Sequence, residues 1–311
     1  MAYAMVLGEA LIDLLETADG AEPLYRAVVG GAPLNVAVGA SRLGAAVEFA
    51  GSLGDDALAD RIGRFLADNG VGTRGVLRAA APTALAVTTF AGAEPDFRFY
   101  GAPPSYGLLD VAGLDAALPA GAAVLYCGSI ALLCPPVLAA ARHAWAATPA
   151  LRVFDPNVRP RLLTGAGDVE RQRAVAAEFA ATADLVKLSA ADAAVLYPDK
   201  PAEAVAGLLR ELGAGVVVLT LGARGALVAA GAQLCRMPAP AVRAVDATGA
   251  GDAVMAALIA DLLAGGVPAD PAGWRRRVEF ALRVAALVCE APGGATAMPT
   301  RAQVAARFGP A

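Results

Sequence analysis

Three residues with almost no side chain, Gly249, Ala250 and Gly251, stand directly before a carboxylate, Asp252. The apolar run 253–259 that follows is typical of a buried helix, so these residues lie where that helix begins. Bare N–H groups at a helix N-terminus can close on an anion together, and the helix dipole adds to the attraction. We therefore expect the stretch to stabilise a transferring phosphoryl group, with Asp252 taking the proton of an attacking hydroxyl. A glycine turn with an aspartate cap is the alternative interpretation.

A second glycine element lies near the N-terminus. Gly30 and Gly31 are followed by a polar amide, Asn35, and then by an apolar helical pattern that ends at Gly44. Adjacent glycines allow a polyol to approach the backbone, and an amide both donates and accepts hydrogen bonds. These residues predict a site for sugar hydroxyls. Capping of the helix by Asn35 is the other interpretation.

Together the two elements resemble the two signatures of the ribokinase (PfkB-type) family of carbohydrate kinases, GG-x-x-x-N-x-A and D-x-x-GAGD. Their order and spacing match the family, so the resemblance spans residues 1–311, which we expect to form a single kinase domain. The resemblance implies ATP-dependent phosphorylation of a sugar. It also implies a small β-sheet lid from segments at about 10–29 and 83–101, which covers the sugar and pairs two subunits into a homodimer.

Between the two elements, β-rich runs alternate with helical patterns. Strands are expected at 3–8, 44–51, 124–128, 151–155, 185–188 and 215–221, and helices at 57–69, 137–147, 171–183 and 202–212. The alternation predicts an α/β fold, a three-layer αβα sandwich with a mostly parallel central sheet. Such sheets bind ligands at the carboxyl ends of their strands, where we expect Asp155, Lys187 and Thr220 to meet.

Composition and charge indicate an intracellular enzyme. No apolar run reaches the ~18 residues of a spanning helix without a charge, and the N-terminus lacks the basic region of a secretory signal. A net charge of −4 and a pI near 5.2 argue against nucleic acid or an anionic membrane as the partner. Separated cysteines and a single histidine, His143, offer little to a zinc site or a histidine triad. We therefore expect a cytoplasmic protein whose ligands are small molecules.

The resemblance extends to residues that hold the acceptor. Asp13 takes the place of a carboxylate that binds sugar hydroxyls, although an aspartate after a strand is more often a turn residue. Phe99 lies in a stretch similar to the aromatic lid strand, of which one face packs and the other touches the sugar. Arg159, in a D-x-N-x-R block, is placed to reach substrate or phosphate oxygens, or else is a solvated arginine in a proline-bounded loop.

Segments 220–225 and 187–192 resemble the nucleotide-binding parts of the family. The first matches a T-L-G-x-x-G turn beside the ATP phosphates and ribose, and the second a motif that organises Mg²⁺ and phosphate. Asp192 stands where glutamate is usual, and its shorter side chain still suits a contact with Mg²⁺ through water. The nucleotide-binding residues implied are Lys187, Ser189, Thr220, Gly222, Gly225, Gly249 and Gly251.

Family members often bind a monovalent cation such as K⁺ near the anion site. Asp246 and the carbonyl of Thr248 match two of its ligands. Capping of the turn before Gly249 by Asp246 is an equally compatible role.

The chain departs from the fructokinase pattern after the lid strand. It has Gly101 where arginine is usual, and then Ser105 and Tyr106 where an Ala-Asp pair is usual. Loss of the arginine removes a contact for an anionic acceptor such as 2-keto-3-deoxygluconate, whereas a neutral ketose has no carboxylate to satisfy.

We therefore expect an ATP- and Mg²⁺-dependent fructokinase that makes a 6-phosphate. The alternatives are a 2-keto-3-deoxygluconate kinase, another sugar or nucleoside kinase, or an inactive sugar-binding regulator on the same fold. A nicotinamide-dependent oxidoreductase is disfavoured, because no G-x-G-x-x-G follows the first predicted strand.

Overall fold

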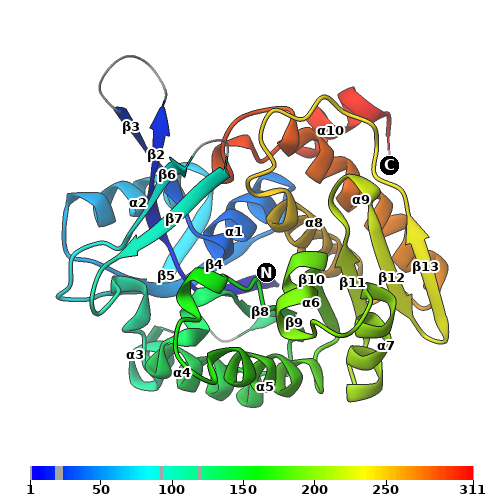
Figure 1. Ribbon diagram of the computed structural model, residues 1–311, viewed down its shortest axis with the longest axis horizontal. Helices are drawn as coiled ribbons and strands as arrows, with labels where there is room; N and C mark the ends of the chain where they lie inside the picture. Colours follow the sequence, from blue (N-terminus) through cyan, green and yellow to red (C-terminus); the bar gives the residue numbers. More distant parts are fainter. Residues whose placement is uncertain (1, 18–23, 92–93, 118–120, 311) are drawn as a thin grey trace.

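A twisted, mostly parallel sheet runs through the middle of the molecule in the computed structural model, which describes residues 2–17, 24–91, 94–117 and 121–310 (Figure 1). Its nine strands within these ranges are β1 (Tyr3–Leu7), β4 (Val47–Leu53), β5 (Val71–Arg78), β8 (Ala122–Gly128), β9 (Leu151–Asp155), β10 (Leu185–Ser189), β11 (Val216–Thr220), β12 (Ala226–Ala230) and β13 (Gln233–Met237). Their order is β13-β12-β11-β10-β9-β8-β1-β4-β5. Pairing is parallel from β11 to β5, and β12 and β13 add an antiparallel hairpin at one edge.

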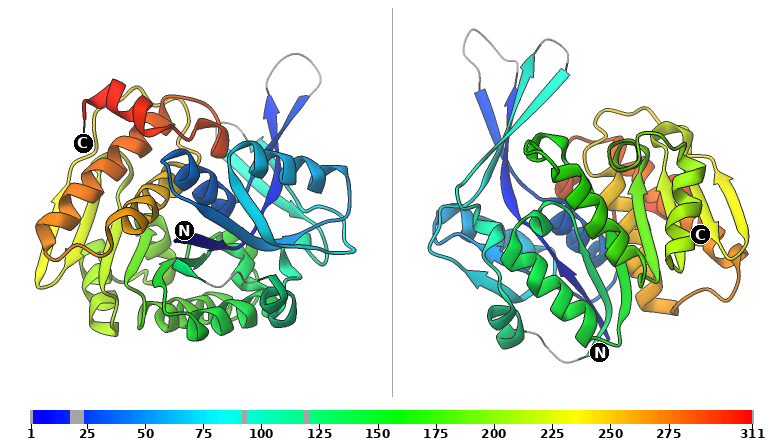
Figure 2. Two further views of the ribbon diagram at one scale, coloured as in Figure 1. Left: turned by 180° about the vertical axis from the view of Figure 1, so that it is seen from behind. Right: turned by 60° about the horizontal axis from the view of Figure 1, so that its bottom comes forward.

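Helices cover both faces of this sheet, as two views from different sides show (Figure 2). One face carries α1 (Ala32–Arg42), α2 (Ala57–Asp68), α8 (Ala250–Gly265), α9 (Pro271–Cys289) and α10 (Arg301–Phe308). The other face carries α3 (Val111–Ala117), α4 (Pro135–Ala147), α5 (Asp168–Ala180), α6 (Ala190–Leu196) and α7 (Ala202–Leu212). Two separate apolar cores result, one on each face, and the predicted three-layer fold is confirmed.

The central strand β1 shows why the sheet lies inside. All five of its residues are buried, because β4 and β8 flank it and helices cover both of its faces. A strand in that position needs a continuous apolar run rather than an alternating one. Predicted bounds match for β9 and α7, whereas β4 begins only at Val47, after the turn at Gly44 (φ +95°).

A second, smaller sheet projects from the body of the molecule (Figure 2). It contains β2 (Leu11–Thr17), β3 (Leu24–Gly30), β6 (Leu85–Ala91) and β7 (Glu94–Tyr100), in the order β3-β2-β6-β7. The β2–β3 and β6–β7 pairs are antiparallel, and β2 and β6 are parallel. These strands coincide with the two segments that the sequence assigned to a lid, except that β3 extends one residue further, to Gly30. Residues 18–23 and 92–93 of these segments lie outside the described ranges.

Close packing of α1 on α8 sets the geometry of the site. A Cβ added at Gly39 would lie 2.7 Å from the Cβ of Ala256, so only glycine leaves room for the two helices at this separation. Gly39 lies four residues after Asn35, and Ala256 lies four residues after Asp252. Residues four apart share one face of a helix, so the contact also brings Asn35 against Asp252.

We expect Gly39→Ala to separate these helices. Overpacking lowers the free energy of unfolding by about 1–3 kcal/mol. The better helix propensity of alanine offsets at most about 1 kcal/mol of this loss. Turnover should fall as well, because the contact between Asn35 and Asp252 lengthens. Gly207→Ala in α7 is the matched control, since nothing lies within 4 Å of its added Cβ. Urea unfolding of both variants checks the prediction, which fails if the two have equal stability.

None of the helices in the described ranges combines the length and the apolar character needed to cross a membrane.

Candidate active site

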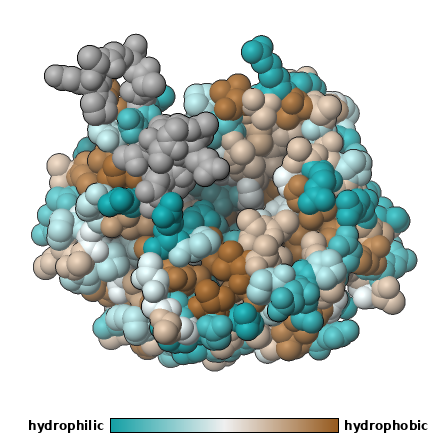
Figure 3. Space-filling model, viewed as in Figure 1, coloured by the Kyte–Doolittle hydropathy of each residue, from teal (hydrophilic) through white to brown (hydrophobic). Residues whose placement is uncertain are grey.

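The carboxyl ends of several central strands meet at one edge of the sheet. Asp155, Ser189 and Thr220 end β9, β10 and β11, and Ser189 lies in register with Thr220. Glu9 and Ser129 follow the ends of β1 and β8, where the strand order reverses. A reversal of this kind opens a crevice for a ligand. The surface is hollowed between the foot of the small sheet and the body of the molecule (Figure 3).

Asp252 lies in the first turn of α8, with 7% of its surface exposed. Its Oδ2 accepts a hydrogen bond from Asn35 Nδ2 at 2.8 Å, and its Oδ1 accepts one from Asn157 Nδ2 at 3.4 Å. Burial raises the pKa of Asp252, while the Lys187 charge, the Asn35 hydrogen bond and the Arg159 charge oppose that rise. The carboxylate is thus oriented by two amides and is more basic than an ordinary aspartate.

Asn35 does not cap its helix. The N-cap of α1 is Gly31, with no side-chain capping bond, and the Asn35 amide nitrogen is directed to Asp252 instead. Asn35 Oδ1 is buried and has no hydrogen-bond partner within the described residues. The predicted contact of Asn35 with sugar hydroxyls stays a prediction, and this acceptor atom is the one open to it.

The open amides at the N-terminus of α8 are not the same set that the sequence suggested. Gly249 (φ +79°) is the N-cap without a capping bond, but the Ala250 N–H donates to the carbonyl of Ala247 at 3.1 Å. Among the described residues, no backbone acceptor faces the N–H of Gly251 or of Asp252. The Gly249 N–H has no acceptor among these residues either, so the cradle depends on the amides of Gly249, Gly251 and Asp252, which the helix dipole favours for an anion.

A buried ion pair stands beside this cradle. Lys187 Nζ donates to Asp155 Oδ2 at 2.8 Å, and the two side chains are 3% and 0% exposed. A Cβ added at Gly251 would lie 2.9 Å from Lys187 Nζ, so the ammonium group borders the amides of α8. Burial opposes the charge of Lys187, but Asp155, Asp192 and Asp252 raise its pKa, and it stays cationic. The site thus holds a fixed positive charge where an anion would enter.

Asp192 is already bound by protein donors. Its Oδ2 accepts from the N–H and the hydroxyl of Ser189, both at 2.7 Å, and its Oδ1 accepts from the Val158 N–H at 2.8 Å. Ser189 and Asp192 form a capping box at the start of α6. Direct coordination by both carboxylate oxygens would break these bonds, so the contact with Mg²⁺ through water stays the form of this prediction that fits.

Asp13 lies against the glycine pair. A Cβ added at Gly30 would collide with Asp13 Oδ2, so glycine is needed for the carboxylate to lie over the backbone there. Gly31 has a φ of +112°, and a Cβ there would lie 2.6 Å from the Glu9 carbonyl oxygen. The glycines predicted to admit a sugar are therefore also required by the protein's own packing.

Two carboxyl groups near this edge have unusual acidity. Burial raises the pKa of Asp13 to about 7, with the charge of Arg159 opposing and that of Asp252 adding to the rise. Burial also raises the pKa of Glu9 to about 7, against hydrogen bonds from Ser129 Oγ and the Ala131 N–H. Both groups change charge near neutral pH.

We expect the KM for the sugar to fall as the pH rises through about 7, because the Asp13 carboxylate accepts hydroxyl protons better than the neutral acid. Asp13→Asn should flatten this profile. Glu9→Gln is the control, because Glu9 has a similar pKa but is bonded to Ser129. Initial rates measured over a pH series test the assignment, and an unchanged profile in Asp13→Asn contradicts it.

The Asp155–Arg159 loop supplies a residue that the sequence analysis did not single out. Asn157 is buried in a positive-φ conformation (φ +36°), and its amide reaches Asp252. Arg159 Nη1 donates to Asn157 Oδ1 at 2.5 Å and to the Val158 carbonyl at 3.2 Å. The exposed Arg159 guanidinium also lowers the pKa of Glu9, Asp13 and Asp252, so it lies within electrostatic reach of the site. Asn157 was detectable as the middle residue of the D-x-N-x-R block.

The other predicted ligand contacts lie at the margins of the site. Thr220 ends β11, and Gly222 and Gly225 both adopt positive φ (+60° and +90°) in the turn that follows. A Cβ at Gly225 would collide with the Met237 carbonyl oxygen, so that glycine serves the β-hairpin itself. Phe99 packs against the core on the α4 face. Nucleotide binding by the turn and sugar contact by Phe99 stay predictions.

Asp246 holds the turn before α8. Its Oδ1 accepts from the Thr248 N–H and its Oδ2 from the Gly293 N–H, both at 2.9 Å. Burial raises the pKa of Asp246, but the hydrogen bonds from Gly293 and Thr248 lower it by more, so the carboxylate is ionised at neutral pH. The turn-capping role is thus present, while cation binding by Asp246 and Thr248 stays a prediction.

The family is decided by a match over almost the whole chain. Residues 1–301 match the sequence pattern of the family described as "pfkB family carbohydrate kinase". The chain belongs to this family. It is an ATP-dependent carbohydrate kinase, as the predicted signatures indicated.

Known kinases resemble the chain along its full length. Fructokinase-1 of Oryza sativa subsp. japonica is 33% identical over 313 residues, which cover 96% of this chain and 94% of the relative. A fructokinase from Xylella fastidiosa, solved with bound ATP, has a TM-score of 0.88 at 30% identity and covers 98% of this chain and 97% of its own. Aminoimidazole riboside kinase from Salmonella enterica, solved with aminoimidazole riboside and an ATP analogue, has a TM-score of 0.84 at 28% identity, with 98% of each chain covered.

Proposed function

We propose that this kinase transfers the γ-phosphoryl group of ATP to the primary 6-hydroxyl of fructose. The observation that carries the proposal is the environment of Asp252. This buried carboxylate is held by Asn35 and Asn157 at the amino end of α8, beside the Lys187 ammonium group. A general base and an anion site are thereby adjacent, as phosphoryl transfer to a hydroxyl requires.

In this proposal Asp252 removes the proton of the attacking hydroxyl. The Asn35 and Asn157 amides donate to its two oxygens and orient them. Burial keeps its pKa above that of an ordinary aspartate, which increases its strength as a base. The hydroxyl oxygen then attacks the phosphorus in line, the bond to the ADP oxygen breaks, and the proton remains on Asp252.

The charge of the migrating group is met by the amides of Gly251 and Asp252 and by Lys187. Asp155 accepts a hydrogen bond from that lysine and holds it in place. The turn 220–225 and the Gly249 backbone are proposed to contact the nucleotide. Electrostatic groups that are fixed before the reaction stabilise the transition state without reorganisation.

Mg²⁺ suits this site as an ion held by the nucleotide phosphates and, through water, by Asp192. Mg²⁺ keeps several of its waters and binds few protein ligands in kinases, which agrees with the protein donors already on Asp192. When bound, it neutralises phosphate charge. We also propose K⁺ at Asp246 and Thr248 as an activating ion.

Fructose is favoured over an anionic acceptor. The likeness to fructokinases supports a ketose, and Gly101 offers no positive charge to the carboxylate of an acidic acceptor. Asp13, Asn35 and the Gly30–Gly31 backbone are polar groups suited to neutral hydroxyls. The Salmonella neighbour makes a riboside a second candidate, since it was solved with aminoimidazole riboside.

An ADP-release screen tests the function. It compares fructose, ribose, 2-keto-3-deoxygluconate, aminoimidazole riboside and adenosine, each with and without K⁺. We expect the highest kcat/KM with fructose. A higher value with another acceptor would overturn the choice of sugar, and no ADP release with any acceptor would favour an inactive sugar-binding regulator.

We further propose that residues 1–311 act as one kinase domain that dimerises through the small sheet, which would serve as a lid. Leu24 and Tyr25 of β3 and Tyr100 of β7 are 56%, 44% and 53% exposed. Exposed large apolar side chains on both edge strands suit a subunit interface. Sedimentation of the protein reports its subunit number. A cytoplasmic location stays a prediction.

A further inference from the structure

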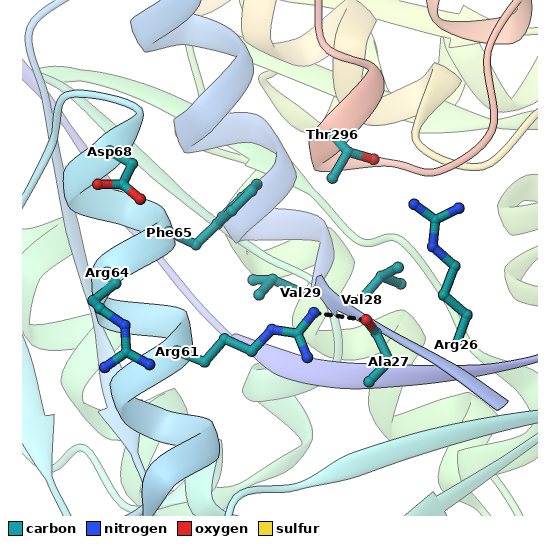
Figure 4. Close-up of a pocket in the computed structure, with 9 residues that line it drawn as sticks. All are labelled: Arg26, Ala27, Val28, Val29, Arg61, Arg64, Phe65, Asp68 and Thr296. Carbon is teal, nitrogen blue, oxygen red and sulfur yellow. Dashed lines mark hydrogen bonds between the residues drawn. The ribbon is translucent and has the colours of Figure 1, made fainter.

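A cavity of about 300 Å³ lies at the edge of the small sheet that β3 forms, between β3 and α2. Figure 4 shows it in close-up, with α1 behind it and Thr296 of the 3₁₀ turn Ala295–Ala297 on the far wall. Its lining includes none of the residues assigned above to the acceptor, the nucleotide or the base.

Positive charge is concentrated at this cavity. Arg26 of β3, Arg61 of α2 and Arg64 of α2 line it, against a single carboxylate, Asp68. Three arginines and one aspartate leave the cavity with two excess positive charges, whereas the whole chain has a net charge of −4. Such a concentration favours an anionic ligand.

The guanidinium groups of Arg26 and Arg61 have N–H donors available for a ligand. Arg61 Nη2 donates to the Ala27 carbonyl at 2.7 Å, which fixes the guanidinium at the cavity wall and leaves its other N–H groups available. Over the ranges that the structure describes, Arg26 makes no side-chain hydrogen bond or ion pair, and Figure 4 shows it on the opposite side from Arg61. Two guanidinium groups that approach from two sides can hold a phosphate by paired hydrogen bonds.

The rest of the lining is apolar. Val29 is buried, and Val28 and Phe65 are half-buried beside it. Inorganic phosphate would leave this surface without a partner, whereas a carbon skeleton attached to the phosphate would cover it. The mixed lining therefore fits a small organic anion better than a bare one.

We propose that this cavity binds a small organic phosphomonoester, with its phosphate between Arg26 and Arg61 and its carbon part against Val28, Val29 and Phe65. The strand that forms one wall continues directly into Gly30 and Gly31 of the acceptor site. A ligand that joins β3 to α2 would thus restrain the strand that leads to the glycine pair. The cavity is a second, regulatory binding site of the kinase.

Isothermal titration calorimetry with glucose 6-phosphate tests the site, with inorganic phosphate and glucose as separate probes. We expect glucose 6-phosphate to bind more tightly than either. Arg26→Gln should weaken binding about tenfold, and Arg26→Gln/Arg61→Gln should weaken it further, since each charged hydrogen bond that is lost costs about that factor. Because Arg26 is exposed and its side chain makes no hydrogen bond or ion pair with the described residues, the single variant should fold normally, which its melting temperature checks.

Two control variants locate the binding. Arg275→Gln removes an exposed arginine of α9 and should bind glucose 6-phosphate like the wild type. Asp252→Asn changes the proposed catalytic base and should also leave this binding unchanged. Equal affinity in the wild type and both Arg26 variants would overturn the proposal, as would tighter binding of inorganic phosphate than of glucose 6-phosphate. Calorimetry needs no turnover, so either failure leaves the proposed kinase reaction intact.

Discussion

Asp252→Asn is expected to lower kcat by about 10²–10⁴-fold, the usual contribution of a positioned general base. The amide has nearly the shape of the carboxylate but cannot accept the hydroxyl proton. KM should change little, because Asp13, Asn35 and the glycine pair, which are proposed to contact the acceptor, are unchanged. Steady-state kinetics on the preferred sugar measure both constants, and near-normal turnover would remove Asp252 from the role of base.

The fold should survive this change. Burial raises the pKa of Asp252 in the folded protein, so its ionisation lowers the stability as the pH rises, and the neutral amide removes that loss. The melting temperature of Asp252→Asn should therefore match or exceed that of the wild type at neutral pH. Asp261→Asn is the matched control, because Asp261 lies on the same helix but pairs with Arg301 away from the site. It should keep full activity.

Lys187→Met is expected to lower the free energy of unfolding by about 3–5 kcal/mol at neutral pH, because it leaves the fully buried Asp155 carboxylate without its partner. Turnover should fall as well, since the positive charge beside the α8 amides is lost. Lys200→Met is the matched control: it removes the only other lysine of the chain, which is exposed. Urea unfolding curves compare the three proteins.

The pH dependence of the unfolding free energy shows whether Lys187→Met loses stability through the unpaired charge of Asp155 or through poorer packing. Burial raises the pKa of Asp155 to about 6 even with Lys187 present, and removal of the lysine raises it further. A folded-state pKa above the unfolded value contributes stability at low pH that is lost as the pH rises through it. The deficit of Lys187→Met should thus shrink as the pH falls toward about 6 and stay constant below it, and Asp155→Asn/Lys187→Met should recover part of the loss at neutral pH. A deficit that is equal at all pH values would assign it to packing alone.

Local patterns predicted much of this architecture correctly. The apolar run after Gly251 correctly predicted α8 and the position of its amino end, because glycine backbone freedom and helical periodicity act over a few residues. The β-rich run at 151–155 was placed at its observed bounds for the same reason. The hairpin β12–β13 and the long helix α9 were not singled out, since neither has a motif that bears on chemistry.

Partners of side chains were harder to predict. Asn35 donates to Asp252, which is 217 residues away, and only the tight packing at Gly39 and Ala256 brings them together. Ala250 looked like an open amide, but the turn at 246–249 folds back and occupies it. Asn157 and Glu9 enter the site from loops whose paths depend on the sheet order.

The sequence by itself thus determined the kinase family, the helix that begins at the anion cradle and the identity of the candidate base. Only the tertiary structure decided which groups hold that base, which amides are open, and that Asp192 is occupied by protein donors. The physical reason is the distance along the sequence over which each effect acts. Propensities and glycine conformations are properties of a few neighbouring residues, whereas burial, ion pairing and acidity depend on segments that meet only after the two sheets and their helices have packed.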